Sequence, residues 1–146
     1  MDRDQPTRAD YRVFYGIPSR WLDNDVYGHI NNVNYYSFFD TAIAHYLMGE
    51  GGLDPWRDGV VGFCVESACR FRRGARFPDR ITAGLKVTRI GRSSVSYAIG
   101  IFRNDEDQTA ADGRFVHVFV ERASERPAAV PPPIRDALKR LLDEAS

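Results

Sequence analysis

Apolar positions recur along the chain with two different spacings. From about Asn32 to Gly49 they return every three or four residues, as on one side of an α-helix. This side is broad, so we expect the helix to be largely enclosed by its surroundings. It carries Tyr35, Tyr36, Phe38, Phe39, Ala42, Ile43, Tyr46 and Leu47. The run Gly49, Gly51 and Gly52 predicts the end of the helix.

Elsewhere apolar residues alternate with polar ones, which is typical of β-strands. One short strand is predicted before the helix and four long ones after it: Tyr11–Ile17, Val60–Arg73, Arg80–Ile90, Ser93–Arg103 and Thr109–Arg122. Short breaks rich in turn residues separate the long strands, so neighbours should pair antiparallel. After Pro131–Pro133 a short amphipathic helix is predicted, with Ile134, Leu138, Leu141 and Leu142 on its apolar side.

One long helix and a run of antiparallel strands predict an α+β fold in a single domain, residues 1–146, with residues 1–9 as a flexible N-terminus. The sheet would have to curl around the helix. A second copy of the chain would complete the core and cover a sheet edge, so we expect a homodimer or homotetramer.

Composition places the chain among ordinary globular proteins, with 43% hydrophobic and 27% charged residues. No apolar run approaches the ~20 residues that span a bilayer, and the charged start does not resemble a secretory signal. Cys64 and Cys69 fall on one predicted strand with side chains on opposite faces, too far apart for a disulfide. These features predict a cytoplasmic protein without a membrane partner.

Charge is balanced overall but not locally. The formal net charge of zero argues against nucleic-acid binding. Between residues 69 and 92, however, there are eight basic residues and only one acidic residue, Asp79. This excess is either a solvated strand face or a docking surface for a phosphorylated ligand, since the guanidinium fork suits phosphate.

The polar segment Asp23–Asn34, just ahead of the predicted helix, is the candidate for chemistry. An EF-hand calcium loop is not favoured, because Asn34 stands where the bidentate glutamate is needed. A transition-metal site on Asp23, Asp25 and His29 would lack further His or Cys ligands nearby, so no metal is expected. Two interpretations remain open from the residues alone. Asp25, Asn31 and Asn32 could simply cap the helix, or Asp25 could act on a carbonyl held by the free amides of the first helical turn.

The run from Trp21 to Tyr36, WLDNDVYGHINNVNYY, resembles the 4-hydroxybenzoyl-CoA thioesterase family of the hotdog fold, and most of all its bacterial acyl-CoA thioesterase branch. The resemblance continues through Ile90–Ser94 and Phe115–Arg122. It implies a hotdog fold, in which a curved antiparallel sheet wraps one long central helix, and hydrolysis of an acyl-CoA substrate without a cofactor.

The resemblance also assigns roles to residues. Asp25 stands at the position of the catalytic aspartate, as nucleophile or general base, and the Asn32 amide where the carbonyl is polarised; His29 would orient substrate or water. The active site would lie at a subunit interface. Substrate or CoA contacts are implied for Tyr27, Gly28, Asn31, Tyr35, Arg89, Arg92, Ser93 and Ser94.

Some alternatives remain. Certain hotdog thioesterases place the carboxylate on the helix, which makes Asp40 a second candidate, and Glu66 faces either the site or solvent. A hotdog hydratase or dehydratase usually places Asp and His five apart in an Asn-Pro context, whereas Asp25 and His29 are four apart. A non-catalytic acyl-CoA binding module is the third possibility, since one fold can host several functions.

Overall fold

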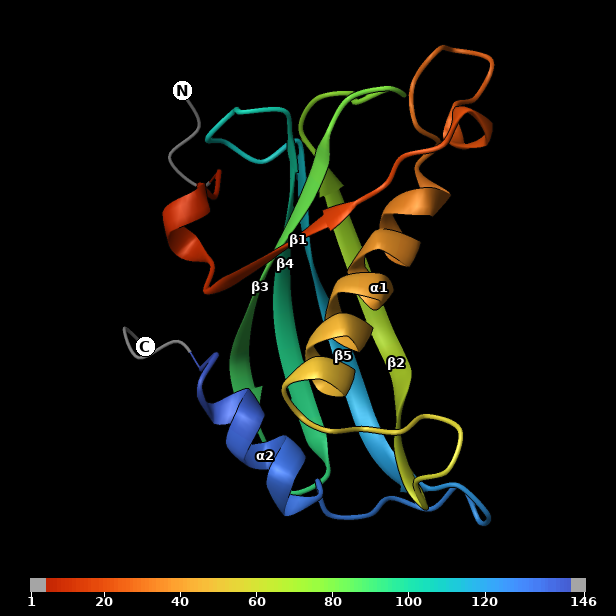
Figure 1. Cartoon of the computed structure of the whole chain (residues 1–146), viewed down its shortest axis with the longest axis vertical. Coiled ribbons are helices and arrows are strands. Elements are labelled where there is room, and N and C mark those ends of the chain that lie inside the picture. The colour runs from red at the N-terminus through yellow and green to blue at the C-terminus, as the bar shows by residue number, and fades with distance from the viewer. Residues whose placement is uncertain (1–4, 143–146) are drawn as a thin grey trace.

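Five antiparallel strands form one sheet, and a long helix lies across one of its faces (Figure 1). We describe residues 5–142 of this computed structural model. In chain order the strands and helices are β1 (Val13–Ile17), α1 (Val33–Gly49), β2 (Val60–Phe71), β3 (Ile81–Ile90), β4 (Ser94–Arg103), β5 (Ala111–Glu121) and α2 (Pro132–Lys139). Two short 3-10 turns, Arg8–Asp10 and Trp21–Asp23, flank β1. The predicted elements are thus confirmed, with ends that differ by a few residues.

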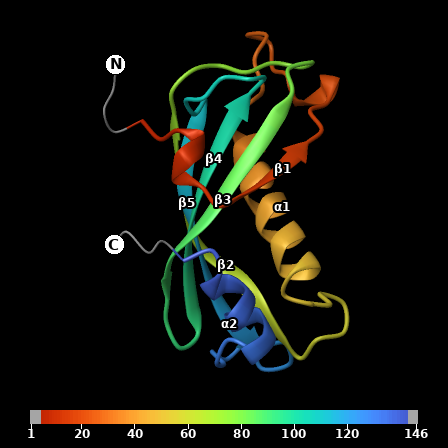
Figure 2. The ribbon, with the colours of Figure 1, turned by 60° about the vertical axis from the view of Figure 1, so that its left-hand side comes forward.

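The strand order is β1-β3-β4-β5-β2, so β1 and β2 are the two edges. Each pairing is antiparallel, as the short connections require. The sheet twists and curls towards α1, as a view turned by 60° shows (Figure 2). The edge of β2 lies alongside α1 and presents the exposed side chains of Phe63, Val65 and Phe71.

The core lies between α1 and the concave face of the sheet. Phe39, Ala42 and Ile43 are at most 1% exposed there, and they pack with apolar side chains of β3, β4 and β5. The prediction of an enclosed helix is only partly right, because Val33, Tyr36 and Met48 on its other flank are exposed. α2 covers the lower end of the core, where the Tyr46 hydroxyl donates to the Ala137 carbonyl at 2.5 Å.

A bulge in β2 changes the predicted strand phase. Cys64 pairs with His117 and Glu66 with Val116, so Val65 is an extra residue. Cys69 pairs with Gly113, which lies on the same side of β5 as His117. Cys64 and Cys69 therefore both face α1, and the prediction that they point to opposite faces is wrong. Both are free thiols.

Residues 1–4 of the segment expected to be flexible lie outside the described chain, whereas its remainder contacts the β4–β5 connection. Thr7 bridges to Gln108, and the Gln5 side chain donates to the Thr109 carbonyl at 2.8 Å. Arg8 donates to the carbonyls of Asn104 and Glu106. No helix among residues 5–142 is long and apolar enough to cross a membrane.

Candidate active site

The segment that leads into α1 folds into a tight loop. Asn24 and Ile30 form an isolated antiparallel bridge, and the Asp25 amide donates to the His29 carbonyl at 2.9 Å. Gly28 closes the turn by donating to the Asp25 carbonyl at 3.0 Å, with a φ of 80° that favours glycine. The loop therefore holds the Asp25 backbone in a fixed hairpin-like geometry.

The Asp25 carboxylate is fixed at both oxygens and still reachable. One oxygen accepts the Tyr27 amide at 2.9 Å, and the other accepts the Asn31 side-chain amide at 3.3 Å. The side chain is half-buried and lines an open hollow of about 600 Å³. Trp21, Leu22, Tyr27, Gly28 and Asn31 also line this hollow.

The first amides of α1 differ in how they are satisfied. The Asn31 amide donates to the Asp23 carbonyl at 2.8 Å, and the Val33 amide to the Asn31 side-chain oxygen at 3.1 Å. The Asn34 amide donates back to the Asn31 carbonyl at 3.0 Å. Within residues 5–142 the Asn32 amide has no acceptor. One donor at the positive end of the helix dipole is thus available to a ligand.

Other contacts anchor this loop to the rest of the fold. Asp23 is 3% exposed and accepts hydrogen bonds from the Arg20 amide and guanidinium. The Ile30 amide donates to the Ala75 carbonyl at 2.8 Å, so the loop is fixed to the β2–β3 connection. The His29 ring lies against Gly74 in the same connection, where a Cβ would come within 2.7 Å of it.

The remaining predicted residues are divided between two ends of the molecule. Tyr35 is buried beneath the loop, where it packs edge-on against Phe71, and burial raises the pKa of its hydroxyl. The other four lie in the β3–β4 turn or in the adjoining strand ends, at the opposite end of the sheet from Asp25 (Figure 1): Arg89, Arg92, Ser93 and Ser94. This turn packs on α2, since Arg135 donates to the Gly91 carbonyl at 2.7 Å. In one protomer the turn and the loop do not converge.

The two alternative carboxylates lie away from the loop. Glu66 forms an ion pair with the exposed Arg114 on the outer face of the sheet. Asp40 lies on α1 and lines a separate cavity with His117, which was not among the predicted site residues. Burial raises the pKa of Asp40. Among residues 5–142 no group of His, Cys, Asp or Glu side chains is arranged to hold a metal ion.

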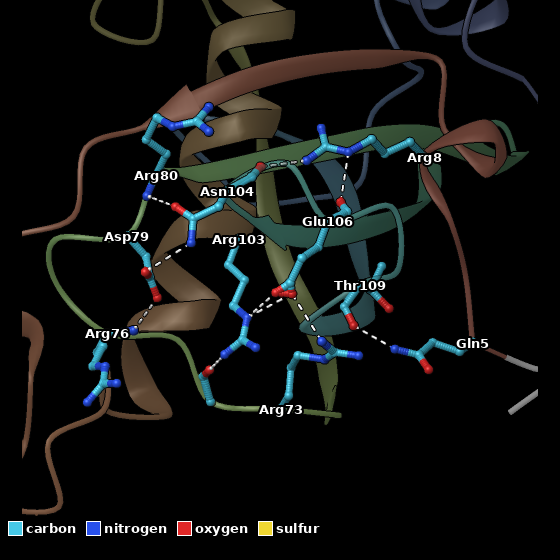
Figure 3. A network of polar contacts seen from close by, with 11 residues as sticks. Gln5, Arg8, Arg73, Arg76, Asp79, Arg80, Arg103, Asn104, Glu106 and Thr109 are labelled. Carbon is cyan, nitrogen blue, oxygen red and sulfur yellow. Dashed lines mark hydrogen bonds and ion pairs between the residues drawn. The ribbon is translucent and has the colours of Figure 1, made fainter. Parts of the chain in front are cut away.

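Several arginines of the basic stretch are paired with acidic residues, and Figure 3 shows one such pair, Arg73 with Glu106. Arg73 contacts Glu106 at 3.0 Å, and Arg80 contacts Asp105 at 2.9 Å. Arg72 contacts Asp112 at 2.9 Å. These three arginines therefore connect loops and strand ends at the upper end of the sheet.

Comparisons with known proteins agree with this architecture. The PA5185 protein of Pseudomonas aeruginosa PAO1 is 49% identical, with a TM-score of 0.95 over 97% of this chain and 99% of that one. A thioesterase from Thermus thermophilus, solved with coenzyme A and zinc, is 26% identical, with a TM-score of 0.75 over 90% and 94% of the two chains. A 1,4-dihydroxy-2-naphthoyl-CoA thioesterase from Synechocystis shares the fold at 18% identity, with a TM-score of 0.78 over 86% and 94%.

No curated relative matches the chain. The sequence profile of the thioesterase-like superfamily, by contrast, matches residues 19–138, which include the Asp25 loop and every strand and helix from α1 onwards except the last residue of α2. With its hotdog architecture, the chain belongs to the thioesterase-like superfamily.

Proposed function

We propose that the protein hydrolyses acyl-CoA thioesters at the start of α1, as a member of the 4-hydroxybenzoyl-CoA thioesterase family. The observation that carries this proposal is the unused Asn32 amide, next in the chain to Asn31, whose side chain holds the half-buried carboxylate of Asp25. The neighbouring amides of Asn31, Val33 and Asn34 are occupied, so this donor is singled out.

The chemistry needs only these groups, the substrate and water. The Asn32 amide and the helix dipole polarise the thioester carbonyl and stabilise the negative charge that develops on its oxygen. Asp25 either attacks the carbonyl carbon, giving an anhydride that water then hydrolyses, or removes a proton from an attacking water. The C–S bond breaks, and CoA leaves as a thiolate that takes up a proton. The products are the free acid and CoA.

Position along α1 favours Asp25 over Asp40. Asp40 follows Asn32 by eight residues, which places it roughly 12 Å along the helix axis at 1.5 Å per residue. A carbonyl held by the Asn32 amide would lie out of reach of that carboxylate within one protomer. The Asn31 side chain, in contrast, joins Asp25 to the first helical turn: its amide nitrogen donates to the Asp25 carboxylate, and its oxygen accepts from the Val33 amide.

We further propose that the working unit contains two copies, joined antiparallel along β2. The exposed Phe63, Val65 and Phe71 on this edge, and Val33 and Tyr36 on the adjacent flank of α1, support such an interface. Antiparallel pairing would bring the β3–β4 turn of one copy to the same end of the joint sheet as the Asp25 loop of the other.

The CoA portion would then be shared between the two copies. Its phosphates would contact the turn that carries Arg89, Arg92, Ser93 and Ser94, and the pantetheine arm would pass the residues beside the hollow, Tyr27, Gly28 and Asn31. His29 would orient substrate or water from the edge of the loop. The coenzyme A bound in the Thermus thermophilus relative supports a ligand of this type.

Two matched pairs of variants test the site. Thiol release from a panel of acyl-CoAs is followed for the wild type, Asp25→Asn and Asp40→Asn; we expect only Asp25→Asn to lose activity. Asn32→Pro removes the amide hydrogen at a position with a φ of −57°, which proline accepts, whereas Asn32→Ala retains it.

We expect Asn32→Pro to lower kcat by about 10²–10³, the cost of one oxyanion donor, and Asn32→Ala to change it little. Helical circular dichroism checks that both variants fold. Full activity in Asp25→Asn would overturn the site, and tight acyl-CoA binding without turnover by the wild type would favour a binding module. Equal kcat values for the two Asn32 variants would remove the amide from the mechanism.

A further inference from the structure

A second cavity lies at the other end of α1, between the helix, the start of β2 and β5. Its volume is about 320 Å³, roughly twice the apolar cavity of about 150 Å³ that holds benzene in an engineered protein core. Most of its lining is apolar, including Ile43, Leu47, Leu53 and Phe63. Arg122 fixes the loop beside it by donating to the Pro55 and Asp58 carbonyls.

His117 is the most buried of the charged or titratable residues that line this cavity. The side chain is 6% exposed, and its Nδ1 lies 3.0 Å from the hydroxyl of the fully buried Tyr97. Because that hydroxyl is a buried donor, it is best satisfied by donating to Nδ1, which leaves the proton of the neutral ring on Nε2. Gly62 lies against the ring, where a Cβ would come within 3.0 Å of Nδ1.

The Nε2–H group has no acceptor among residues 5–142. Among residues 5–142, every fully buried side-chain nitrogen or oxygen has a hydrogen-bond partner. Nε2 has none, so it must be accessible. Nε2 therefore opens onto the cavity that His117 lines. A donor in the wall of a mostly apolar cavity favours a ligand oxygen, because an apolar ligand would leave it unpaired.

Resting on the proposed function, we infer that this cavity receives the distal end of the acyl group and that His117 Nε2–H recognises a hydroxyl or keto oxygen there. A carboxylate is not the fitting ligand, because Asp40 lines the same cavity and burial lowers the pKa of His117 to about 4, which keeps the ring neutral. Burial raises the pKa values of the neighbouring Tyr97 and Cys64, so both groups are neutral near that pH.

Helix geometry gives the length of the acyl group. Asp40 and Ala44, which both line the cavity, follow Asn32 by eight and twelve residues, or roughly 12 and 18 Å along the axis. In an extended chain, carbon–carbon bonds of about 1.5 Å advance only about 1.25 Å each because the chain zigzags, so roughly 10–14 bonds cover this span. The substrate class is thus a medium-chain acyl-CoA with an oxygen near its distal end.

The test compares kcat/KM for dodecanoyl-CoA and 12-hydroxydodecanoyl-CoA. We expect the wild type to prefer the hydroxylated substrate by about 2- to 12-fold, as for one neutral hydrogen bond. The double variant His117→Phe with Tyr97→Phe removes the pair without leaving the Tyr97 hydroxyl unpaired, and it should lose the preference while hydrolysing dodecanoyl-CoA. His117→Gln can accept from Tyr97 and donate to the cavity, so it should restore the preference.

A wild-type ratio near one, or a preference that survives in the double variant, would overturn the inference and leave the proposed function intact. Absence of hydrolysis by the wild type would instead overturn the proposed function. In that case, calorimetric binding of 12-hydroxydodecanoic acid and dodecanoic acid to the same variants decides on His117: equal affinities in the wild type would refute its role.

Discussion

Burial of His117 makes the stability of the fold depend on pH in a defined range. Its pKa falls from 6.5 to about 4 because the buried ring loses the hydration of its charged form. Between these two pKa values the unfolded chain binds a proton that the folded chain does not. The free energy of unfolding therefore rises with pH in this range. The contribution of His117 to it is lost as the pH falls from about 6.5 towards 4.

The difference between the pKa values, about 2.5, corresponds to about 3 kcal/mol at 1.36 kcal/mol per pKa unit. His117→Gln isolates this contribution, because glutamine can accept from Tyr97 and does not titrate. The raised pKa of Asp40 acts with the opposite sign: folding favours its protonated form, so acidification relieves a penalty. The effect of Asp40 is the same in the wild type and in His117→Gln, so it cancels when the two are compared.

The assay is urea unfolding at fixed protein concentration, at pH 7 and at pH 4.5, for the wild type and His117→Gln. Relative to the variant, the wild type should lose about 2 kcal/mol between these two pH values. Parallel changes in the two proteins, within about 0.5 kcal/mol, would show that the ring is charged or hydrated in the folded state, and the reasoning about the cavity would be wrong.

Two further predictions concern packing and charge. Gly113→Ala should destabilise the fold by about 3 kcal/mol or more, because its Cβ would stand 2.0 Å from the Ala68 carbonyl oxygen; Gly49→Ala, with open space around it, is the control and should change stability by at most about 1 kcal/mol. Asp112→Ala should cost about 3 kcal/mol, because Arg72 and Asp112 are 11% and 15% exposed. Asp105→Ala, from an exposed pair, should cost nothing measurable. Thermal unfolding by circular dichroism checks both pairs, and comparable losses in a variant and its control would contradict the argument.

The order of elements could be predicted from sequence because long strands and a long helix repeat their apolar period many times. The β2 bulge could not, since a single extra residue such as Val65 leaves the local alternation plausible in either phase. Ion pairs such as Arg73–Glu106 join residues far apart in the sequence, so the basic stretch looked less compensated than it is.

The candidate site shows the same division. Asp25 and the helix start are local in sequence, so their proximity was predictable, whereas the free Asn32 amide depends on which acceptors its neighbours find. The sequence around His117 could have identified this residue. It stands between Phe115 and Phe119 on the inward phase of a strand, where a polar side chain requires a buried partner.

The bulge at Val65 also divides β2 into two halves that border different parts of the molecule. Residues before it pair with the end of β5 and border the His117 cavity, whereas those after it pair with the beginning of β5 and lead to the connection that anchors the Asp25 loop. Because the extra residue interrupts the ladder, each half keeps its own side-chain phase. On the proposed function, substitutions in the first half of β2 would reshape the acyl end of the site without rotating the side chains that support the reacting end.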